Sequence, residues 1–125
     1  YHAFPYLHDE MGAAFAAADL AVCRAGASTL GELPAFGLPA ILVPYPHAWR
    51  YQRVNADYLA GRGAALVLED QQLENLTSMV LGLMSDRSRL HSMRQAMRSL
   101  ARPQAADELA ALLLTLAASR TQQRM

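Results

Sequence analysis

Three short runs of apolar residues constrain the fold of this chain more than any other feature. They are LAVC at 20–23, AILV at 40–43 and AALVLE at 64–69. The patterns between them, from near residue 30 to Gly37 and from about Arg50 to Leu59, are typical of helices. Uninterrupted apolar strands that alternate with helices are buried on both faces in a parallel sheet. We therefore expect a doubly wound α/β fold, with a parallel sheet and helices on both faces.

Helical patterns also precede the first run and follow the last. The stretch DEMGAAFAAAD at 9–19 is expected to form a helix that Asp9 or His8 caps. After residue 69 the chain is expected to be helical, and its apolar stripes at helical spacing are predicted to be core faces. The stripes are Leu73, Leu76, Val80 and Leu83; Leu90, Met93, Met97 and Leu100; and Leu109, Leu112, Leu113 and Leu116.

The helix between the first two strands carries start and stop signals. Thr29 and Glu32 have the spacing of a capping box, which predicts a start near residue 30. Gly37 is expected to end the helix, because glycine readily adopts the left-handed conformation of a C-terminal cap. Pro34 lies inside this span and lacks the N–H that a helix needs, so a kink or a later start is expected.

Composition excludes several classes of protein. The 125 residues fit a single domain, 1–125, and the 11 basic and 11 acidic residues give no net field that would attract nucleic acid. Every basic residue is arginine, which excludes the phosphate-loop NTPases and Schiff-base chemistry, since both need lysine. The single cysteine, Cys23, excludes an internal disulfide and is expected to be a small buried residue. No apolar run is long enough to span a bilayer, so the domain is expected to be soluble and cytoplasmic. Because the chain begins at Tyr1, we expect it to be a fragment.

The loop RAGAST at 24–29 has two possible roles. It follows a strand, so it is expected at the carboxyl edge of the sheet, where ligands bind in such folds. Gly26 permits close approach of the backbone, and the unpaired N–H groups of Ala27, Ser28 and Thr29 at a helix start can receive a diphosphate. Glu32, one turn further, can accept the hydroxyls of a ribose. An ordinary strand-to-helix turn with a capping box explains the same residues, and the pattern alone leaves both open.

The second strand is followed by PYPHAWRYQ, which is expected at the same edge. Gln52 and Asn55 are three residues apart and share a helix face, and their amides suit sugar hydroxyls. Two solvated surface residues are the alternative. Arg24 and Arg50 are candidate anion contacts. His47 is more easily explained as a turn residue, since no nucleophile or paired carboxylate is near it in the sequence.

Together these motifs closely resemble the C-terminal, donor-binding domain of glycosyltransferase family 28. The resemblance is strongest to its members that add N-acetylglucosamine to a lipid-linked muramoyl-pentapeptide in peptidoglycan synthesis. It covers residue 4 to about residue 115. Its specific parts are the helix start DEM, the turn and helix CRAGAST...E, the segment GLPAILVPYPH and the helix pattern Q..NA.

The resemblance implies a role for individual residues. The backbone at His8 would contact the uracil ring. The segment that holds the diphosphate and ribose would be Ala27, Ser28, Thr29, Leu30, Gly31 and Glu32, with Glu32 on the ribose hydroxyls. Gln52 would contact the N-acetylglucosamine, at its C4 hydroxyl, with Asn55 nearby. The chain departs from the family pattern at Tyr51, where Gln or His is common, and at His8, where an aliphatic residue is usual.

The resemblance also implies what lies outside this chain. The expected whole is a two-domain GT-B glycosyltransferase with a Rossmann-like C-terminal half, inverting and with no cofactor or metal. The missing N-terminal domain would bind the lipid acceptor and supply the catalytic residues, and contact with the membrane would come only through that domain. The enzyme would be peripheral at the cytoplasmic face of the bacterial membrane, with UDP-N-acetylglucosamine as its donor, and this fragment would be inactive alone. Alternatives are a related UDP-sugar transferase with another lipid or natural-product acceptor, and a non-catalytic nucleotide-sugar-binding module.

Overall fold

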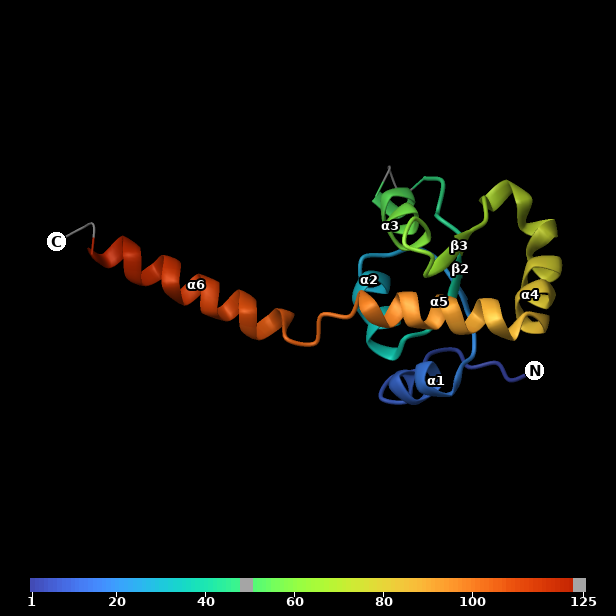
Figure 1. Ribbon diagram of the computed structural model, residues 1–125, viewed down its shortest axis with the longest axis horizontal. Helices are drawn as coiled ribbons and strands as arrows, with labels where there is room; N and C mark the ends of the chain where they lie inside the picture. Colours follow the sequence, from blue (N-terminus) through green and yellow to red (C-terminus); the bar gives the residue numbers. More distant parts are fainter. Residues whose placement is uncertain (48–50, 123–125) are drawn as a thin grey trace.

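The computed structural model describes the chain at residues 1–47 and 51–122, with side chains as far as residue 119 (Figure 1). The body holds three strands and a set of helices around them. The strands are Ala21–Cys23 (β1), Ala40–Leu42 (β2) and Ala65–Val67 (β3). The helices are Met11–Ala17 (α1), Thr29–Phe36 (α2), Tyr51–Ala60 (α3), the 3-10 helix Asp70–Asn75 (η1), Leu76–Ser85 (α4), Arg87–Ser99 (α5) and Ala105–Gln122 (α6).

The three strands form one parallel sheet in the order β1-β2-β3, as the apolar runs predicted. Val22 pairs with Ile41, and Ile41 pairs with Leu66. β2 is the central strand, and all three of its residues are buried. The third strand is shorter than expected and ends at Val67, and the chain enters η1 at Asp70.

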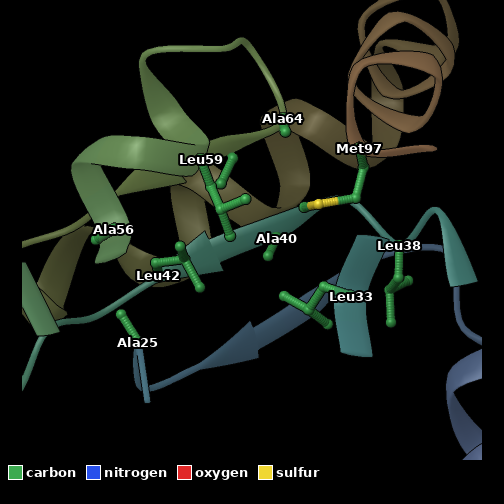
Figure 2. Packing of buried hydrophobic residues seen from close by; sticks show 10 residues of the cluster. Ala25, Leu33, Leu38, Ala40, Leu42, Ala56, Leu59, Ala64 and Met97 are labelled. Carbon is green, nitrogen blue, oxygen red and sulfur yellow. The ribbon is translucent and has the colours of Figure 1, made fainter. Parts of the chain in front are cut away.

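Helices cover both faces of the sheet, which confirms the doubly wound, Rossmann-like plan. Ala40 and Leu42 of β2 lie in one buried cluster with Leu33 of α2 and Leu59 of α3 (Figure 2). Ile41, between them in the strand, belongs to a second cluster, whose other buried members are Val43, Leu68, Leu83 and Met93. Successive side chains of a strand point to opposite faces, so the all-apolar run AILV supplies both cores.

The start of α2 differs from the predicted capping box. Ser28 is the N-cap and has helical backbone angles (φ −61°, ψ −31°), and its side chain makes no cap hydrogen bond. Thr29 is already the first helical residue, and its hydroxyl donates to the carbonyl oxygen of Arg24 at 3.2 Å. A capping side chain needs an extended backbone at the cap position, which this loop does not have. The stop is as predicted, since Gly37 has φ +60°.

Pro34 lies inside α2 and is buried. The helix ends two residues later, at Phe36, and the N–H groups of Gly37 and Leu38 still reach the carbonyls of Pro34 and Leu33. The missing N–H of proline therefore interrupts a helix that is near its end, where few bonds depend on it.

The first helix is shorter than predicted and lacks the predicted caps. It begins at Met11 with Glu10 as its N-cap, and no side chain bonds there. The carbonyl of His8 accepts from the N–H of Met11 at 3.2 Å, so the backbone rather than Asp9 or the His8 ring closes this turn.

The apolar stripes of α4 and α5 are core faces, as expected. Leu83, Met93 and Met97 are buried, and Leu76, Val80, Leu90 and Leu100 pack against the clusters. Leu73 in η1 is an exception and is 43% exposed.

The stripe in α6 is not a core face. Its members Leu109, Leu112, Leu113 and Leu116 are 53–58% exposed, and α6 projects away from the body (Figure 1). Helical spacing predicts which face is apolar but not what covers it, and no part of the described chain does so. Within the residues described, none of the helices combines the length and apolarity needed to cross a bilayer.

Candidate functional site

Three loops meet at the carboxyl edge of the sheet, and Arg24 joins them. Its guanidinium follows β1, donates to the carbonyl of Val43 after β2 at 3.3 Å, and pairs with the carboxylate of Asp70 after β3 at 2.5 Å. It also lies 5.3 Å from the centre of the Tyr45 ring. The predicted convergence of the first two loops is therefore present, and the loop after β3 joins them. Arg24, expected as an anion contact, already has an anionic partner in this structure.

The loop before α2 presents backbone donors. The N–H groups of Gly26, Ala27 and Ser28 have no acceptor among the described residues. The N–H of Thr29 was also expected to be free, but it donates to the carbonyl of Gly26 at 3.2 Å, because the chain makes a tight turn there before the helix proper. Ala27 and Ser28 are exposed. Free N–H groups at a helix start, with the helix dipole behind them, favour an anion.

The next residues of the loop are paired within the helix. The N–H groups of Leu30, Gly31 and Glu32 donate to the carbonyls of Ala27 and Ser28. Of the six residues from Ala27 to Glu32, only the first two have backbone donors available to a ligand.

Gln52 and Asn55 each fasten a loop of this edge to α3. The Oε1 of Gln52 accepts from the backbone N–H of Tyr45 at 2.9 Å, and the Nδ2 of Asn55 donates to the carbonyl of Ala25 at 3.0 Å. Both side chains are half-buried rather than solvated. The sequence correctly placed them on one face, but it did not reveal that each holds a loop. The Nε2 of Gln52 has no acceptor in the part of the chain that the structure describes.

The side chain of Glu32 is exposed, and its carboxylate makes no hydrogen bond or ion pair with the described residues, so it does not serve the capping box that its spacing suggested. It lies beside Cys23 in a pocket of about 340 Å³ between α1 and α2. Burial, and to a lesser extent the charge of Glu32, raises the pKa of the Cys23 thiol. Its carboxylate is free to accept hydrogen bonds from a ligand at the edge of α2.

The two candidate histidines each lie beside a tyrosine ring. The ring of His8 is exposed and lies 4.5 Å from the ring of Tyr6, measured between centroids. His47 is exposed at the turn after β2, where its ring meets Tyr45 edge-on at 5.5 Å. Arg50 lies outside the described residues. Among residues 1–47 and 51–119, no three His, Cys, Asp or Glu side chains gather as metal ligands would.

A pocket of about 790 Å³ opens beside these loops and was not predicted from the sequence. It is lined by Pro44, Tyr45, Pro46, Tyr51, Arg53, Glu69, Asp70 and Gln71. Tyr45 follows β2 and Glu69 follows β3, so the position after each strand was the signal that could have identified them. Tyr51, noted as a departure from the family pattern, is 75% exposed in this pocket.

Arg53 lines this pocket and pairs with two carboxylates. It pairs with Asp57 on the next turn of α3 and with Glu69 after β3. The hydrogen bond to Asp57, together with the charges of Asp57 and Glu69, raises the pKa of the Arg53 guanidinium. The pocket therefore has a charged wall whose groups already pair with one another.

Known proteins resemble this chain over most of its length. Residues 1–109 match the model of the glycosyltransferase family 28 C-terminal domain. A protein of Chlorobium luteolum is 48% identical over 112 residues, covering 87% of this chain and 31% of its own length. One of Syntrophotalea carbinolica is 52% identical over 104 residues, covering 81% of this chain and 29% of its own. Both are named UDP-N-acetylglucosamine--N-acetylmuramyl-(pentapeptide) pyrophosphoryl-undecaprenol N-acetylglucosamine transferase.

A solved structure agrees with this. The crystal structure of Acinetobacter baumannii MurG superposes with a TM-score of 0.78 at 32% identity, covering 90% of this chain and 33% of that one. The chain thus spans about a third of the length of the relatives it matches. With the family model matched along residues 1–109 and a parallel sheet whose loops meet at its carboxyl edge, this chain belongs to glycosyltransferase family 28, in its C-terminal domain.

Proposed function

We propose that this chain is the domain that binds UDP-N-acetylglucosamine in an enzyme that transfers N-acetylglucosamine to a lipid-linked muramoyl-pentapeptide. The observation that carries the proposal is the row of free N–H groups at Gly26, Ala27 and Ser28, at the start of α2, in a member of this family. The names of the relatives from Chlorobium luteolum and Syntrophotalea carbinolica support the choice of donor and acceptor.

The diphosphate binds at this row of donors. Its oxygens accept from the N–H groups of Ala27 and Ser28, with the hydroxyl of Ser28 beside them. Glu32 lies one turn further along α2 and accepts both ribose hydroxyls, which is consistent with its exposed and unpaired carboxylate. The uracil lies toward the backbone at His8. Thr29, Leu30 and Gly31 shape the turn, since their own N–H groups are already bonded.

The side-chain amides of Gln52 and Asn55 have different roles: one contacts the sugar and the other positions a loop. Gln52 donates its free Nε2 to a hydroxyl of N-acetylglucosamine, while its Oε1 holds the loop at Tyr45. Asn55 is a positioning residue, because its Nδ2 is already committed to the carbonyl of Ala25 and thereby fixes the loop that carries the diphosphate donors. A fixed loop presents its N–H groups without the cost of reorganising them when the donor arrives.

The reaction follows from this placement. The acceptor hydroxyl attacks the anomeric carbon as the bond to UDP breaks, which inverts the configuration at that carbon. Negative charge collects on the departing diphosphate. The oriented N–H groups at the start of α2 and the dipole of that helix stabilise this charge more in the transition state than in the bound donor.

The rest of the enzyme lies outside this chain in our proposal. An N-terminal Rossmann-like domain completes a GT-B enzyme, binds the lipid acceptor and supplies the catalytic base, so the chain alone binds donor without transferring it. The enzyme is peripheral at the cytoplasmic face of the membrane.

Amide chemical shifts test the diphosphate site directly. The N–H resonances of Gly26, Ala27 and Ser28 are expected to move when UDP is added and to stay in place with uridine, which has the same base and ribose but no phosphates. The amide of Leu114 on α6 is the control and is expected to move with neither. Equal movements with UDP and uridine, or none with UDP at saturation, would contradict the proposed diphosphate site.

A further inference from the structure

One nitrogen of Arg24 connects the first loop at the carboxyl edge of the sheet to the other two. Its Nη1 donates to the carbonyl oxygen of Val43 at 3.3 Å and to the carboxylate of Asp70 at 2.5 Å. Arg24 follows β1, Val43 follows β2 and Asp70 follows β3. A single side chain of the loop that leads into α2 therefore holds the loops after both other strands.

The backbone at Arg24 and Ala25 is also held in place. The carbonyl of Arg24 accepts from the hydroxyl of Thr29 at 3.2 Å, and the carbonyl of Ala25 accepts from the Nδ2 of Asn55 at 3.0 Å. The free N–H groups at 26–28 follow directly in the chain. Their orientation therefore depends on how firmly Arg24 and Ala25 are fixed.

Tyr45 links Arg24 to the sugar side of the site. The guanidinium of Arg24 lies 5.3 Å from the centre of the Tyr45 ring, a distance at which a cation is attracted to an aromatic ring. The backbone N–H of Tyr45 donates to the Oε1 of Gln52 at 2.9 Å. Arg24 is thus connected through one residue to the amide that we assign to N-acetylglucosamine.

These contacts occupy the guanidinium that a direct phosphate contact would need. Its partners Val43, Tyr45 and Asp70 all belong to the other two loops. If Arg24 turned to a diphosphate, the carboxylate of Asp70 would lose its counter-charge in a pocket that Glu69 also lines. Like charges in one pocket disfavour each other. The arrangement therefore favours an arginine that stays with Asp70 when an anion binds nearby.

We propose that Arg24 and Asp70 are positioning residues of the donor site, an inference that rests on the proposed function. Their ion pair orients the loop whose free N–H groups receive the diphosphate, and the guanidinium itself does not contact the phosphates. Asp70 thereby determines how tightly the donor binds without touching it. The side chains of the pair are 47% and 32% exposed, so the pair adds little to the free energy of unfolding and acts mainly on binding.

Calorimetric titration with UDP separates positioning from direct contact by the sign of the change. Asp70→Asn keeps the shape of the side chain and removes its charge. UDP is expected to bind about three- to fivefold more weakly, the upper part of the range for a partly exposed ion pair. If Arg24 contacted the phosphates directly, the same substitution would release it, and UDP would bind more tightly.

Glu69→Gln is the matched control for Asp70→Asn. It removes one negative charge from the adjacent residue of the same pocket, but Glu69 pairs with Arg53 and not with Arg24. The dissociation constant for UDP is expected to change by at most about 1.5-fold. An equal loss of affinity in the two variants would mean that the charge of the pocket, and not the pair with Arg24, affects the donor.

A double substitution tests whether Arg24 and Asp70 act as one unit. Arg24→Gln alone is expected to weaken UDP binding about tenfold, because the contacts with Val43 and Tyr45 are lost together with the ion pair. Adding Asp70→Asn to Arg24→Gln is expected to cause no further loss, since the partner of Asp70 is already absent. Additive losses would show that the two residues act independently.

Amide chemical shifts of the unliganded chain test the positioning role without a ligand. The N–H resonances at 26–28 are expected to move in Asp70→Asn and to stay in place in Glu69→Gln, while the unfolding free energy of both variants stays close to that of the wild type. Unmoved resonances in Asp70→Asn, or UDP binding that is unchanged or tighter in that variant, would overturn the proposal. A folded wild-type chain that does not bind UDP would instead refute the proposed function, and the unliganded spectra would still decide the positioning role.

Discussion

The side-chain amide of Asn55 donates to the carbonyl of Ala25 at 3.0 Å and so ties α3 to the loop that leads into α2. Ala25 is fully buried, and its carbonyl receives no other bond from the described residues. A helix after the second strand thus determines the shape of a loop after the first.

Removing this amide is expected to destabilise the fold. In Asn55→Ala the buried carbonyl of Ala25 loses its donor, which costs about 1–3 kcal/mol in the free energy of unfolding. Urea denaturation measures this. Asn75→Ala is the matched control, because Asn75 caps α4 without a side-chain hydrogen bond, and it is expected to change the free energy by less than about 0.5 kcal/mol. Similar losses of unfolding free energy in both variants would show that the hydrogen bond to Ala25 does not stabilise the fold more than an ordinary surface asparagine does.

A substitution at Gln52 can remove the amide donor while keeping the oxygen that accepts from Tyr45. Gln52→Glu keeps the oxygen that accepts from Tyr45 but loses the free amide donor that we assign to the sugar. We expect UDP to bind as before, while UDP-N-acetylglucosamine binds about 2- to 10-fold more weakly, the range for one neutral hydrogen bond. Calorimetry with both ligands measures the two constants. Equal weakening of UDP and the sugar nucleotide would place Gln52 away from the sugar.

Glu32 is expected to contribute to ligand binding and not to folding. Glu32→Ala should weaken UDP binding by about 1.5–3 kcal/mol, because a charged acceptor is lost from the ribose hydroxyls. The free energy of unfolding should hardly change, because the carboxylate is exposed and unpaired among the residues described. Glu108→Ala on α6 serves as the control. An unchanged dissociation constant for UDP in a folded Glu32→Ala protein would exclude the ribose assignment.

The sequence was informative where one local pattern had one structural solution. The all-apolar run AILV at 40–43 predicted a strand of a parallel sheet that is buried on both faces, and the order of strands and loops placed Arg24, Gln52 and Tyr45 at one edge. Gly37 ended α2 as predicted, because its φ of +60° suits glycine.

The sequence was less informative where the same residue pattern fits two different structures. Thr29 and Glu32 fit a capping box, but the loop enters the helix with Ser28 already in helical conformation, so neither residue serves as a cap. Leu109 and Leu113 have core spacing, yet no described element lies near enough to cover them. The hydrogen bond from Asn55 to Ala25 spans 30 residues and leaves no local signal in the sequence.

The contribution of Cys23 to the free energy of unfolding is expected to fall as the pH rises. Burial, with a smaller contribution from the charge of Glu32, raises the pKa of the folded thiol above its ordinary value of 9.0. The unfolded thiol therefore ionises first as the pH rises. The stability that Cys23 contributes is complete below pH 9 and is lost as the pH rises through the higher folded pKa.

Urea denaturation between pH 8 and 11, on the wild type and Cys23→Ala, isolates this contribution. The difference in unfolding free energy between the two is expected to shrink as the pH increases. A difference that grows with pH would mean that the folded thiol ionises more readily than the unfolded one. Glu32→Gln removes the charge that is the smaller of the two causes of the raised pKa of Cys23. The folded and unfolded pKa values of the thiol should then lie closer together, so the unfolding free energy should change over a narrower pH range.

Deleting 103–125 is expected to leave the body folded. No residue of α6 belongs to either buried cluster, so the midpoint of urea unfolding should shift little. The exposed leucines are expected to drive concentration-dependent self-association of the full chain, and sedimentation should show less of it after the deletion. A large loss of stability would mean that α6 packs on the body in solution.

The most direct test of the central claim is calorimetric titration of the folded chain with UDP-N-acetylglucosamine, UDP-glucose and UDP, without added metal. We predict binding of all three with a preference for UDP-N-acetylglucosamine over UDP-glucose, and loss of binding in Glu32→Ala. Absence of binding by a folded sample, or equal affinity for the two sugar nucleotides, would contradict the claim that the loop before α2 and the amide of Gln52 form the donor site.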